Sequence, residues 1–254
     1  MTTPTVESLR VLKLYGFATA LEEQVKSGDY AELSFEDRLA LLVEREKIER
    51  ENHSLSIRIG RAKFRHKAAA EDIRAGNARG LDKSTLRQLS ICDWVRKKNN
   101  IIITGPSGIG KSFIATALAH KACLLGFNAR YFRASTLLSD LASARTDGRG
   151  RRYITNLGKV QVLIIDDWAL SSITEQEEKD LFELVEERHN STSTIFTSQT
   201  PVKLWHGLMP NPTIADAILD RIVHNSYRLE LTGNDSGRKD LEPKPLDKEV
   251  HKQT

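Results

Sequence analysis

The sequence has few cysteines and no long hydrophobic run. Cys92 and Cys123 are the only cysteines among 254 residues, and no Cys-x-x-Cys pair occurs. This spacing indicates neither a zinc site nor a disulfide framework, so two reduced thiols in a cytoplasmic protein are expected. No apolar run approaches the roughly 18 residues of a membrane-spanning helix. Residues 1–20 also lack the basic region and cleavage site of a signal peptide.

A large excess of one charge is absent as well. The formal net charge is +4, with 39% hydrophobic and 28% charged residues, a composition that is ordinary for a globular protein. A mildly basic chain permits a nucleic-acid partner without requiring one. The length allows one large domain, or a core with an appendage.

The first 70 residues have the pattern of helices. Apolar residues recur at mostly helical spacing over residues 9–21, and Ser34 to Asp37 resembles a capping box that opens a second helix. A break in that helix is expected near Asn52. We expect a small all-helical N-terminal domain over residues 1–70, as a candidate for oligomerisation and for contacts with DNA or a partner. A connector over residues 71–100 follows it.

From residue 101 onward, apolar strand patterns alternate with helical ones. Such alternation predicts a parallel sheet with helices on both faces, here a five-stranded α/β core over residues 101–232. The last residues, 233–254, carry interspersed charges and are expected to form a flexible tail. The predicted strands are 101–104, 129–134, 160–165, 194–198 and 227–231, and the predicted helices are 111–125, 135–144, 175–189 and 214–224.

The segment from Gly105 to Ser112 matches the phosphate-loop pattern G-x4-G-K-[ST] in full. Glycines let successive backbone N–H groups point at phosphate oxygens, and the following helix adds its positive N-terminus. Lys111 is expected to reach the β- and γ-phosphates, and the Ser112 hydroxyl to ligate Mg²⁺. The predicted nucleotide contacts are Gly105, Pro106, Ser107, Gly108, Ile109, Gly110, Lys111, Ser112 and Phe113.

Two neighbouring carboxylates follow the third predicted strand. With a phosphate loop in the chain, Asp166 is expected to hold Mg²⁺, and Asp167 to act as the base that polarises the attacking water. The alternative for Asp167 is that it caps the next helix. No Asn-Lys-x-Asp guanine signature is present, so ATP is expected in preference to GTP.

Further candidates lie near the end of the chain. Ser198 and Gln199 end a strand that is expected to lie beside the acid strand, where they could orient water; a simple polar strand end is the alternative. Arg221 lies near the end of a predicted helix. It is a candidate arginine finger that acts in a neighbouring subunit, or else a partner of the helix dipole, Asp216 or Asp220.

Two basic segments are candidates for contacting DNA. The first, residues 145–153, is expected to be a glycine-containing loop that follows a phosphate backbone, with Tyr153 stacking on a base. The second, residues 58–67, holds no acidic residue. Solvated charged surfaces are the alternative for both, and no base-reading motif is visible, so weak sequence preference is expected. The candidate DNA contacts are Arg145, Arg149, Arg151 and Arg152 in the first segment, and Arg58, Arg61, Lys63, Arg65 and Lys67 in the second.

The motifs GPSGIGKS, VLIIDDW, TSQTP and DAILDRIVHN, taken in this order, resemble the IstB-like transposition helper ATPases. These belong to the AAA+ superfamily, with the DnaC-like helicase loaders. The resemblance extends over residues 6–232. It implies an ATPase that forms homo-oligomers on double-stranded DNA, with nucleotide between subunits, and that recruits a partner transposase.

The same resemblance assigns roles to individual residues. It places Gly80 and Leu81 beside the adenine, Ser198 and Gln199 in the sensor-1 region, and Arg221 as the finger in trans. The pair Asp166-Asp167 departs from the Asp-Glu of many AAA+ ATPases, which is compatible with slow turnover. So few residues follow the last strand that the helical lid is expected to be reduced or absent, with Arg238 the only local candidate for a sensor-2 arginine. A replicative helicase loader and a DNA-binding scaffold with little hydrolysis are the alternative functions.

Overall fold

The structure is a computed structural model that describes residues 4–73, 76 and 80–233. All but the first residue of the predicted tail, 233–254, therefore lies outside the described residues, and so does Arg238. Contacts group the chain into two compact units, Met1–Arg61 and Ala62–Thr254. Among the described residues, no helix has both the length and the hydrophobicity that crossing a membrane requires.

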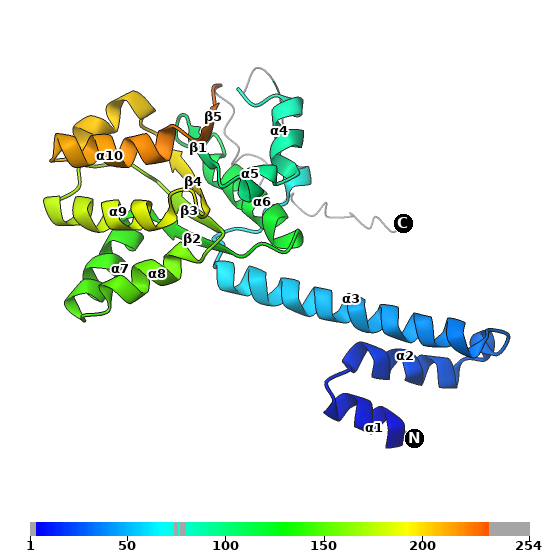
Figure 1. Cartoon of the computed structure of the whole chain (residues 1–254). Helices are drawn as coiled ribbons and strands as arrows, with labels where there is room; N and C mark the ends of the chain where they lie inside the picture. Colours follow the sequence, from blue (N-terminus) through cyan, green and yellow to red (C-terminus); the bar gives the residue numbers. More distant parts are fainter. Residues whose placement is uncertain (1–3, 74–75, 77–79, 234–254) are drawn as a thin grey trace, which may run out of the picture. The chain divides into compact units, whose positions relative to one another are not determined.

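The first unit is built from helices (Figure 1). It contains α1 (Pro4–Val11), α2 (Tyr15–Lys26), the single 3₁₀ turn η1 (Gly28–Tyr30) and α3 (Phe35–Ala62). The main-chain N–H of Asp37 donates to Ser34 Oγ at 3.1 Å, so Ser34 caps α3 as predicted. The expected break near Asn52 is wrong. The helix is continuous over 28 residues, because neither glycine nor proline interrupts it before Gly60.

Helix α2 approaches α3 closely at Gly16. A Cβ atom at Gly16 would lie 2.7 Å from the main-chain oxygen of Arg45, so only glycine fits there. Beside it, the Phe17 N–H donates to the Glu46 carboxylate, which also pairs with Arg50 at 2.6 Å. The two helices are thus joined by a backbone approach and a buried acid, with few large apolar side chains between them.

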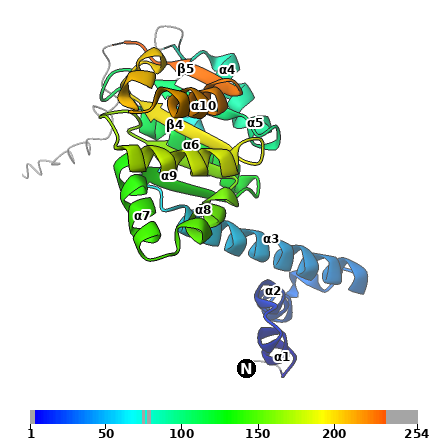
Figure 2. The ribbon, with the colours of Figure 1, turned by 60° about the vertical axis from the view of Figure 1, so that its left-hand side comes forward.

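The second unit contains the predicted five-stranded parallel sheet (Figure 2). The strand order is β2-β3-β4-β1-β5, so the chain crosses over through helices between parallel neighbours. All five predicted strands are present. Their bounds are β1 (Asn100–Thr104), β2 (Ala129–Arg133), β3 (Val162–Asp166), β4 (Ser193–Ser198) and β5 (Ser226–Glu230).

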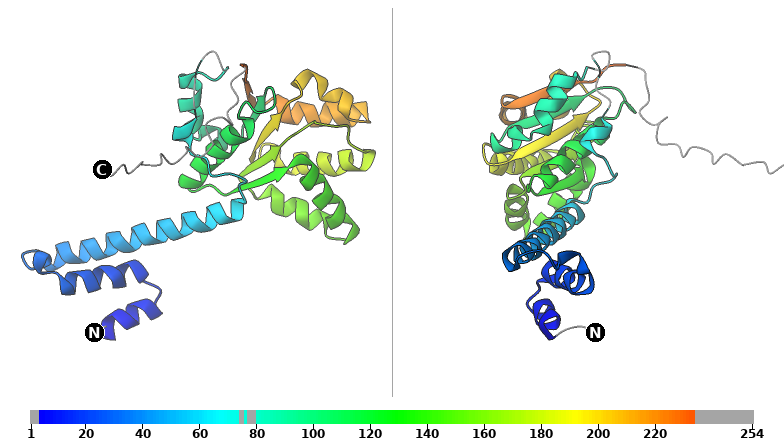
Figure 3. Two further views of the ribbon diagram at one scale, coloured as in Figure 1. Left: turned by 180° about the vertical axis from the view of Figure 1, so that it is seen from behind. Right: turned by 90° about the vertical axis from the view of Figure 1, so that its right-hand side faces the viewer.

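Helices cover both faces of the sheet (Figure 3). Helix α6 (Lys111–Leu124) lies on one face, against β1 to β4, and contacts η2 (Ala70–Asp72) and α4 (Lys83–Ser90). The short α5 (Asp93–Arg96) leads into β1. The helices of the other face pack on one another and enclose a core that contains Phe196, Trp168 and Trp205. They are α7 (Ala134–Thr146), α8 (Gly150–Gly158), α9 (Glu175–Arg188) and α10 (Pro212–Val223), the last preceded by η4 (Val202–Leu204) and η5 (His206–Leu208).

Helix α8 replaces most of the predicted glycine loop over residues 145–153. Arg145 belongs to α7, and only residues 147–149 lie between α7 and α8. The buried Ile154 and Leu157 give α8 an apolar face on α9, and this packing outweighs the two glycines at its ends. The expected loop is therefore a helical hairpin.

The guanidinium of Arg188 joins three elements at the end of α9. Its side chain is buried and donates to the carbonyls of Leu157, Val160 and Ser193 at 2.5, 2.9 and 2.6 Å, and to Thr194 Oγ1 at 3.0 Å. Burial lowers the pKa of Arg188 to about 9. The cation thus makes four hydrogen bonds at the place where α8, the end of α9 and the start of β4 meet.

We expect Arg188→Ala to lower the free energy of unfolding by about 3–5 kcal/mol, because it removes four hydrogen bonds from a buried site. Arg188→Lys keeps the charge but not the fork of donors, so a smaller loss is expected. Denaturant unfolding followed by circular dichroism measures both changes. Arg152→Ala, at an exposed position of α8, is the control; equal losses for Arg152→Ala and Arg188→Ala would contradict the assignment.

Candidate nucleotide-binding site

The phosphate loop joins the carboxyl end of β1 to the start of α6. Its glycines have positive φ angles: 148° at Gly105, 79° at Gly108 and 101° at Gly110. At Gly105 a Cβ atom would lie 2.6 Å from the main-chain oxygen of Leu231. The loop therefore has the strand–loop–helix context that the motif requires, with the N-terminus of α6 directed at its centre.

Lys111 lies at the start of α6 and bends back over this loop. Its side-chain Nζ donates to the carbonyls of Gly105 and Pro106, both at 2.8 Å. Burial lowers the pKa of Lys111, while the charges of Asp167 and Asp166 act in the opposite direction. Both of these acceptors are neutral, so a phosphate in the loop would give the ammonium a charged acceptor.

Asp166 ends β3 and is the centre of a buried hydroxyl cluster. The Ser112 hydroxyl donates to Asp166 Oδ1 at 2.7 Å and the Tyr131 hydroxyl donates to Oδ2 at 2.5 Å. A third donor, Thr197 Oγ1, also reaches Oδ1. Burial, and secondly the bond to Asp166, raise the pKa of Tyr131. The phosphate loop and the acid strand are therefore directly joined by Ser112 and Asp166.

The donors around Ser112 and Asp166 suit Mg²⁺. Among the described residues, no group of three or more His, Cys, Asp or Glu side chains could hold a metal ion. One carboxylate and one hydroxyl fit Mg²⁺, which takes its remaining ligands from nucleotide phosphates and water. These two side chains could hold the ion only together with a bound nucleotide.

Asp167 follows in a left-handed backbone conformation, with φ 59°. Its N–H donates to Thr197 Oγ1 at 3.2 Å, and its carboxylate lies 4.0 Å from Nε of Arg133. It does not cap the next helix: Thr174 caps α9, through a capping box with Glu177. The alternative expected for Asp167 is therefore wrong, and its half-exposed carboxylate is near enough for its charge to act on Lys111 of the phosphate loop.

The end of β4 is arranged differently from the prediction. The Ser198 hydroxyl is buried and donates to the Trp168 carbonyl at 2.6 Å, and Gln199 is exposed. Thr197 is the residue of this strand that contacts both Asp166 and the Asp167 backbone. Sequence reasoning missed Thr197 and Tyr131. Pairing Ile165 with Phe196 across β3 and β4 would have placed Thr197 opposite Asp166.

The connector meets the phosphate loop at the end of β5. Gly80 has a φ angle of 72°, and a Cβ atom there would lie 2.0 Å from the Glu230 carbonyl oxygen. Leu81 is 1% exposed. The Leu231 N–H donates to the Thr104 carbonyl at 2.8 Å, directly before Gly105. Gly80 and Leu81 are thus close to the loop, as a contact with a base would require.

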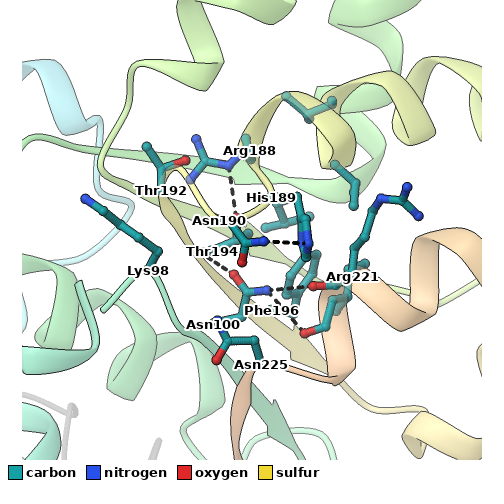
Figure 4. Close-up of a pocket in the computed structure, with 14 residues that line it drawn as sticks. Lys98, Asn100, Arg188, His189, Asn190, Thr192, Thr194, Phe196, Arg221 and Asn225 are labelled. Atoms are coloured by element: carbon teal, nitrogen blue, oxygen red, sulfur yellow. Dashed lines mark hydrogen bonds between the residues drawn. The ribbon is translucent and has the colours of Figure 1, made fainter. Parts of the chain in front are cut away.

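Arg221 lies at the other end of β1. Asn100, the first residue of β1, donates to the carbonyls of Arg221 and Ile222 at 3.3 and 3.2 Å, and accepts from the Thr194 N–H (Figure 4). Five residues of strand separate that end from the phosphate loop, roughly 13 Å. The Arg221 side chain has Nε 2.6 Å from Oε2 of Glu186, and its guanidinium lies over the Phe182 ring. Neither Asp216 nor Asp220, the expected ion-pair partners, is its partner.

The first basic segment is largely occupied by contacts within the chain. Arg145 donates to both carboxylate oxygens of Asp180, at 3.1 Å each, and Arg149 pairs with Asp147. The Tyr153 hydroxyl donates to Asp140 at 3.2 Å, so its ring is half-buried instead of free to stack. Arg151 and Arg152 are exposed in the first turn of α8.

The second basic segment is divided between the two units. Arg58 and Arg61 belong to the first unit, and the remaining three candidates belong to the second. Lys63, Arg65 and Lys67 are all exposed, and Lys63 and Arg65 line a hollow at the edge of the sheet. The structure thus brings part of this segment next to β2.

Known proteins resemble this chain in sequence and in fold. The model of the family described as IstB-like ATP binding protein matches residues 7–243. The insertion sequence ATP-binding protein y4pL of Sinorhizobium fredii is 45% identical over 230 residues, which cover 91% of this chain and 94% of that protein. The DnaC helicase loader has a TM-score of 0.53 at 16% identity over 65% of this chain and 97% of its own. AMPPCP-bound DnaA from Aquifex aeolicus has a TM-score of 0.57 at 16% identity, over 70% of this chain and 54% of its own.

The parallel sheet, its strand order and the phosphate loop define a P-loop protein with an AAA+ fold. Within that class, the chain belongs to the family of IstB-like ATP binding proteins.

Proposed function

We propose that this protein binds ATP with Mg²⁺ and hydrolyses it slowly. The observation that carries the proposal is the hydrogen bond between Ser112 and Asp166, which joins a complete phosphate loop to the acid strand. Lys111 would bind the β- and γ-phosphates, and Ser112 and Asp166 would hold the metal ion that neutralises phosphate charge. The family description supports ATP as the nucleotide.

Asp167 is the proposed base for the attacking water, with Gln199 to orient it. The position of Asp167 after Asp166, with its side chain half-exposed, supports this role. An aspartate reaches one methylene less far than a glutamate, which supports slow turnover and keeps open the alternative of a scaffold with little hydrolysis. The Ser198 hydroxyl is bonded to the Trp168 carbonyl and the Thr197 hydroxyl to Asp166, so the exposed Gln199 is the residue proposed to orient water.

Arg221 is proposed to act on the nucleotide of a neighbouring copy. Its distance from the phosphate loop of its own chain supports action in trans, since the side chain is too short to cover the length of β1. The Arg221 guanidinium would leave Glu186 and pair with the γ-phosphate of the nucleotide bound by a neighbouring copy, so it would keep an anionic partner. Nucleotide would then join the subunits of a homo-oligomer.

We further propose that the oligomer assembles on double-stranded DNA and recruits a partner transposase. The name of y4pL, an insertion sequence ATP-binding protein, supports a role in transposition. In the first unit, Phe35, Leu41 and Val43 are exposed at 78%, 47% and 55%, which supports contacts with another copy or a partner. A helicase loader is the alternative, supported by the fold likeness to DnaC.

Sedimentation of the protein with and without ligands tests this function. In the presence of both duplex DNA and a non-hydrolysable ATP analogue, we expect assemblies of several copies on one duplex. Either ligand alone should give smaller species, because nucleotide joins copies and DNA gathers them. Electron microscopy of the same samples shows whether the copies surround the duplex. Single copies in saturating ATP analogue and DNA would contradict the proposal.

A further inference from the structure

The edge strand β2 borders a basic hollow of about 440 Å³, called the edge hollow below. In the described sheet β2 pairs only with β3, so its other side faces this space. The cations that line it come from the segment after α3 and from β2 itself. They are Lys63, Arg65, Arg130 and Arg133, and the lining also includes Tyr131 and Asp140.

The charges in the edge hollow are unbalanced. Four cations face one carboxylate, Asp140, which already accepts a hydrogen bond from Tyr153. The Arg130 guanidinium lies 5.4 Å from the centre of the Phe132 ring. Arg133 is 4.0 Å from Asp167, beyond hydrogen-bond distance. Such a group of cations favours a ligand with several negative charges.

One side chain joins the edge hollow to the nucleotide site. Tyr131 lines the hollow, and its hydroxyl donates to Asp166 Oδ2 at 2.5 Å. Asp166 in turn accepts from Ser112 of the phosphate loop. A second link runs from Arg133 in the hollow to Asp167. Both acids of the proposed catalytic site therefore have a partner on β2.

We propose that the edge hollow binds the phosphate backbone of duplex DNA and that Tyr131 transmits its occupancy to Asp166. This inference rests on the proposed function and assigns the DNA contact to Lys63, Arg65, Arg130 and Arg133. A phosphate beside Tyr131 competes with Asp166 for the phenol proton. Without that bond, Asp166 Oδ2 would be available to help hold Mg²⁺ together with Ser112, and Arg133 would turn from Asp167 to the phosphate. Tyr131 is then a positioning residue that makes ATP turnover depend on DNA.

Binding to a fluorescent duplex tests the assignment of the edge hollow. We expect Lys63→Gln with Arg65→Gln to weaken binding about tenfold or more. The slope of log K against log salt is negative, and its magnitude should decrease by about 1.8, because two phosphate contacts are lost and each contributes about 0.9. Lys159→Gln with Lys203→Gln, at exposed positions outside the hollow, is the matched control and should keep the wild-type slope. Equal effects of the two double variants would overturn the assignment.

Tyr131→Phe tests the coupling, because it removes only the hydroxyl. DNA affinity should stay within twofold of wild type, while the ratio of ATP turnover with DNA to turnover without DNA should fall to about one. A readout besides turnover is the Mg²⁺ titration of a fluorescent ATP analogue. In Tyr131→Phe without DNA, its midpoint should move to the value that wild type shows with DNA. A wild-type ratio and a wild-type midpoint would overturn the coupling.

The outcomes separate the proposals. If the wild-type protein binds no duplex, the proposed DNA function fails and the edge hollow with it. If it binds but the Lys63 and Arg65 variant binds equally well, only the edge hollow is wrong. A third outcome is that Lys111→Ala still binds the ATP analogue and loses this binding when Lys63 and Arg65 are also changed. The edge hollow would then be a second nucleotide site, and the DNA assignment would be overturned.

Discussion

Replacing Lys111 by alanine is expected to weaken ATP binding at least about 100-fold. The donors of its ammonium group lie over the phosphate loop, where Nζ donates to the carbonyls of Gly105 and Pro106. Two charge-assisted hydrogen bonds to phosphate are worth about 1.5–3 kcal/mol each, and about 2.7 kcal/mol already corresponds to 100-fold. Titration of a fluorescent ATP analogue in the presence of Mg²⁺ measures the change.

Loss of folding would not explain this result. Burial lowers the pKa of Lys111, which means that the folded state holds its charge at a cost. Removing the charge should therefore leave the unfolding midpoint in the absence of nucleotide unchanged or raise it. Lys121→Ala is the control on the same helix, because Lys121 pairs with Glu71 far from the loop. Tight ATP binding by Lys111→Ala would remove the basis of the proposed function.

The parts of the site that lie within one segment could be predicted from the sequence. The phosphate loop is a continuous stretch whose glycines have no substitute at their φ angles, and the acid pair directly follows an apolar strand. The five strands were recognisable because a parallel sheet buries both of its faces and so needs short, fully apolar runs. Local pattern was therefore sufficient for the nucleotide-binding core.

The parts that depend on pairing between segments were not predictable in the same way. Tyr131 and Thr197 reach Asp166 from the strands on either side of it, and the sequence does not state the register of those strands. Likewise, the pairing of Arg221 with Glu186 depends on how α10 packs on α9. Helix α8 was missed because Gly148 and Gly150, before and at its first residue, suggested a loop, although its apolar residues are spaced for a helix.

The contacts of the charged side chains also change which of them can bind DNA. In residues 145–153, two of the four arginines are paired with acids of the same chain. The segment 63–67 contains no acidic residue. Its Lys63 and Arg65 line the edge hollow together with Arg130 and Arg133 of β2. A count of charges treats the two segments as equal. Pairing within the folded chain favours the second as the surface that a phosphate backbone can neutralise.

Replacing Arg221 by alanine is expected to leave ATP binding within about twofold and to lower DNA-dependent turnover by a factor of 10³ or more, the usual effect of losing an arginine finger. Binding is spared because Arg221 lies at the opposite end of β1 from the phosphate loop. Turnover of ATP to ADP and phosphate measures the loss. Arg228→Ala, at an exposed position of β5, is the matched control and should retain wild-type turnover.

Mixing two inactive variants distinguishes action in trans from action within one chain. Arg221→Ala keeps an intact phosphate loop, and Lys111→Ala keeps an intact finger. In an assembly of equal parts, about a quarter of the interfaces combine the intact loop of one copy with the intact finger of the next. The mixture should therefore regain a comparable fraction of wild-type turnover, although each variant alone has almost none. No recovery in mixed assemblies, or full turnover by Arg221→Ala alone, would show that Arg221 does not serve a neighbouring nucleotide.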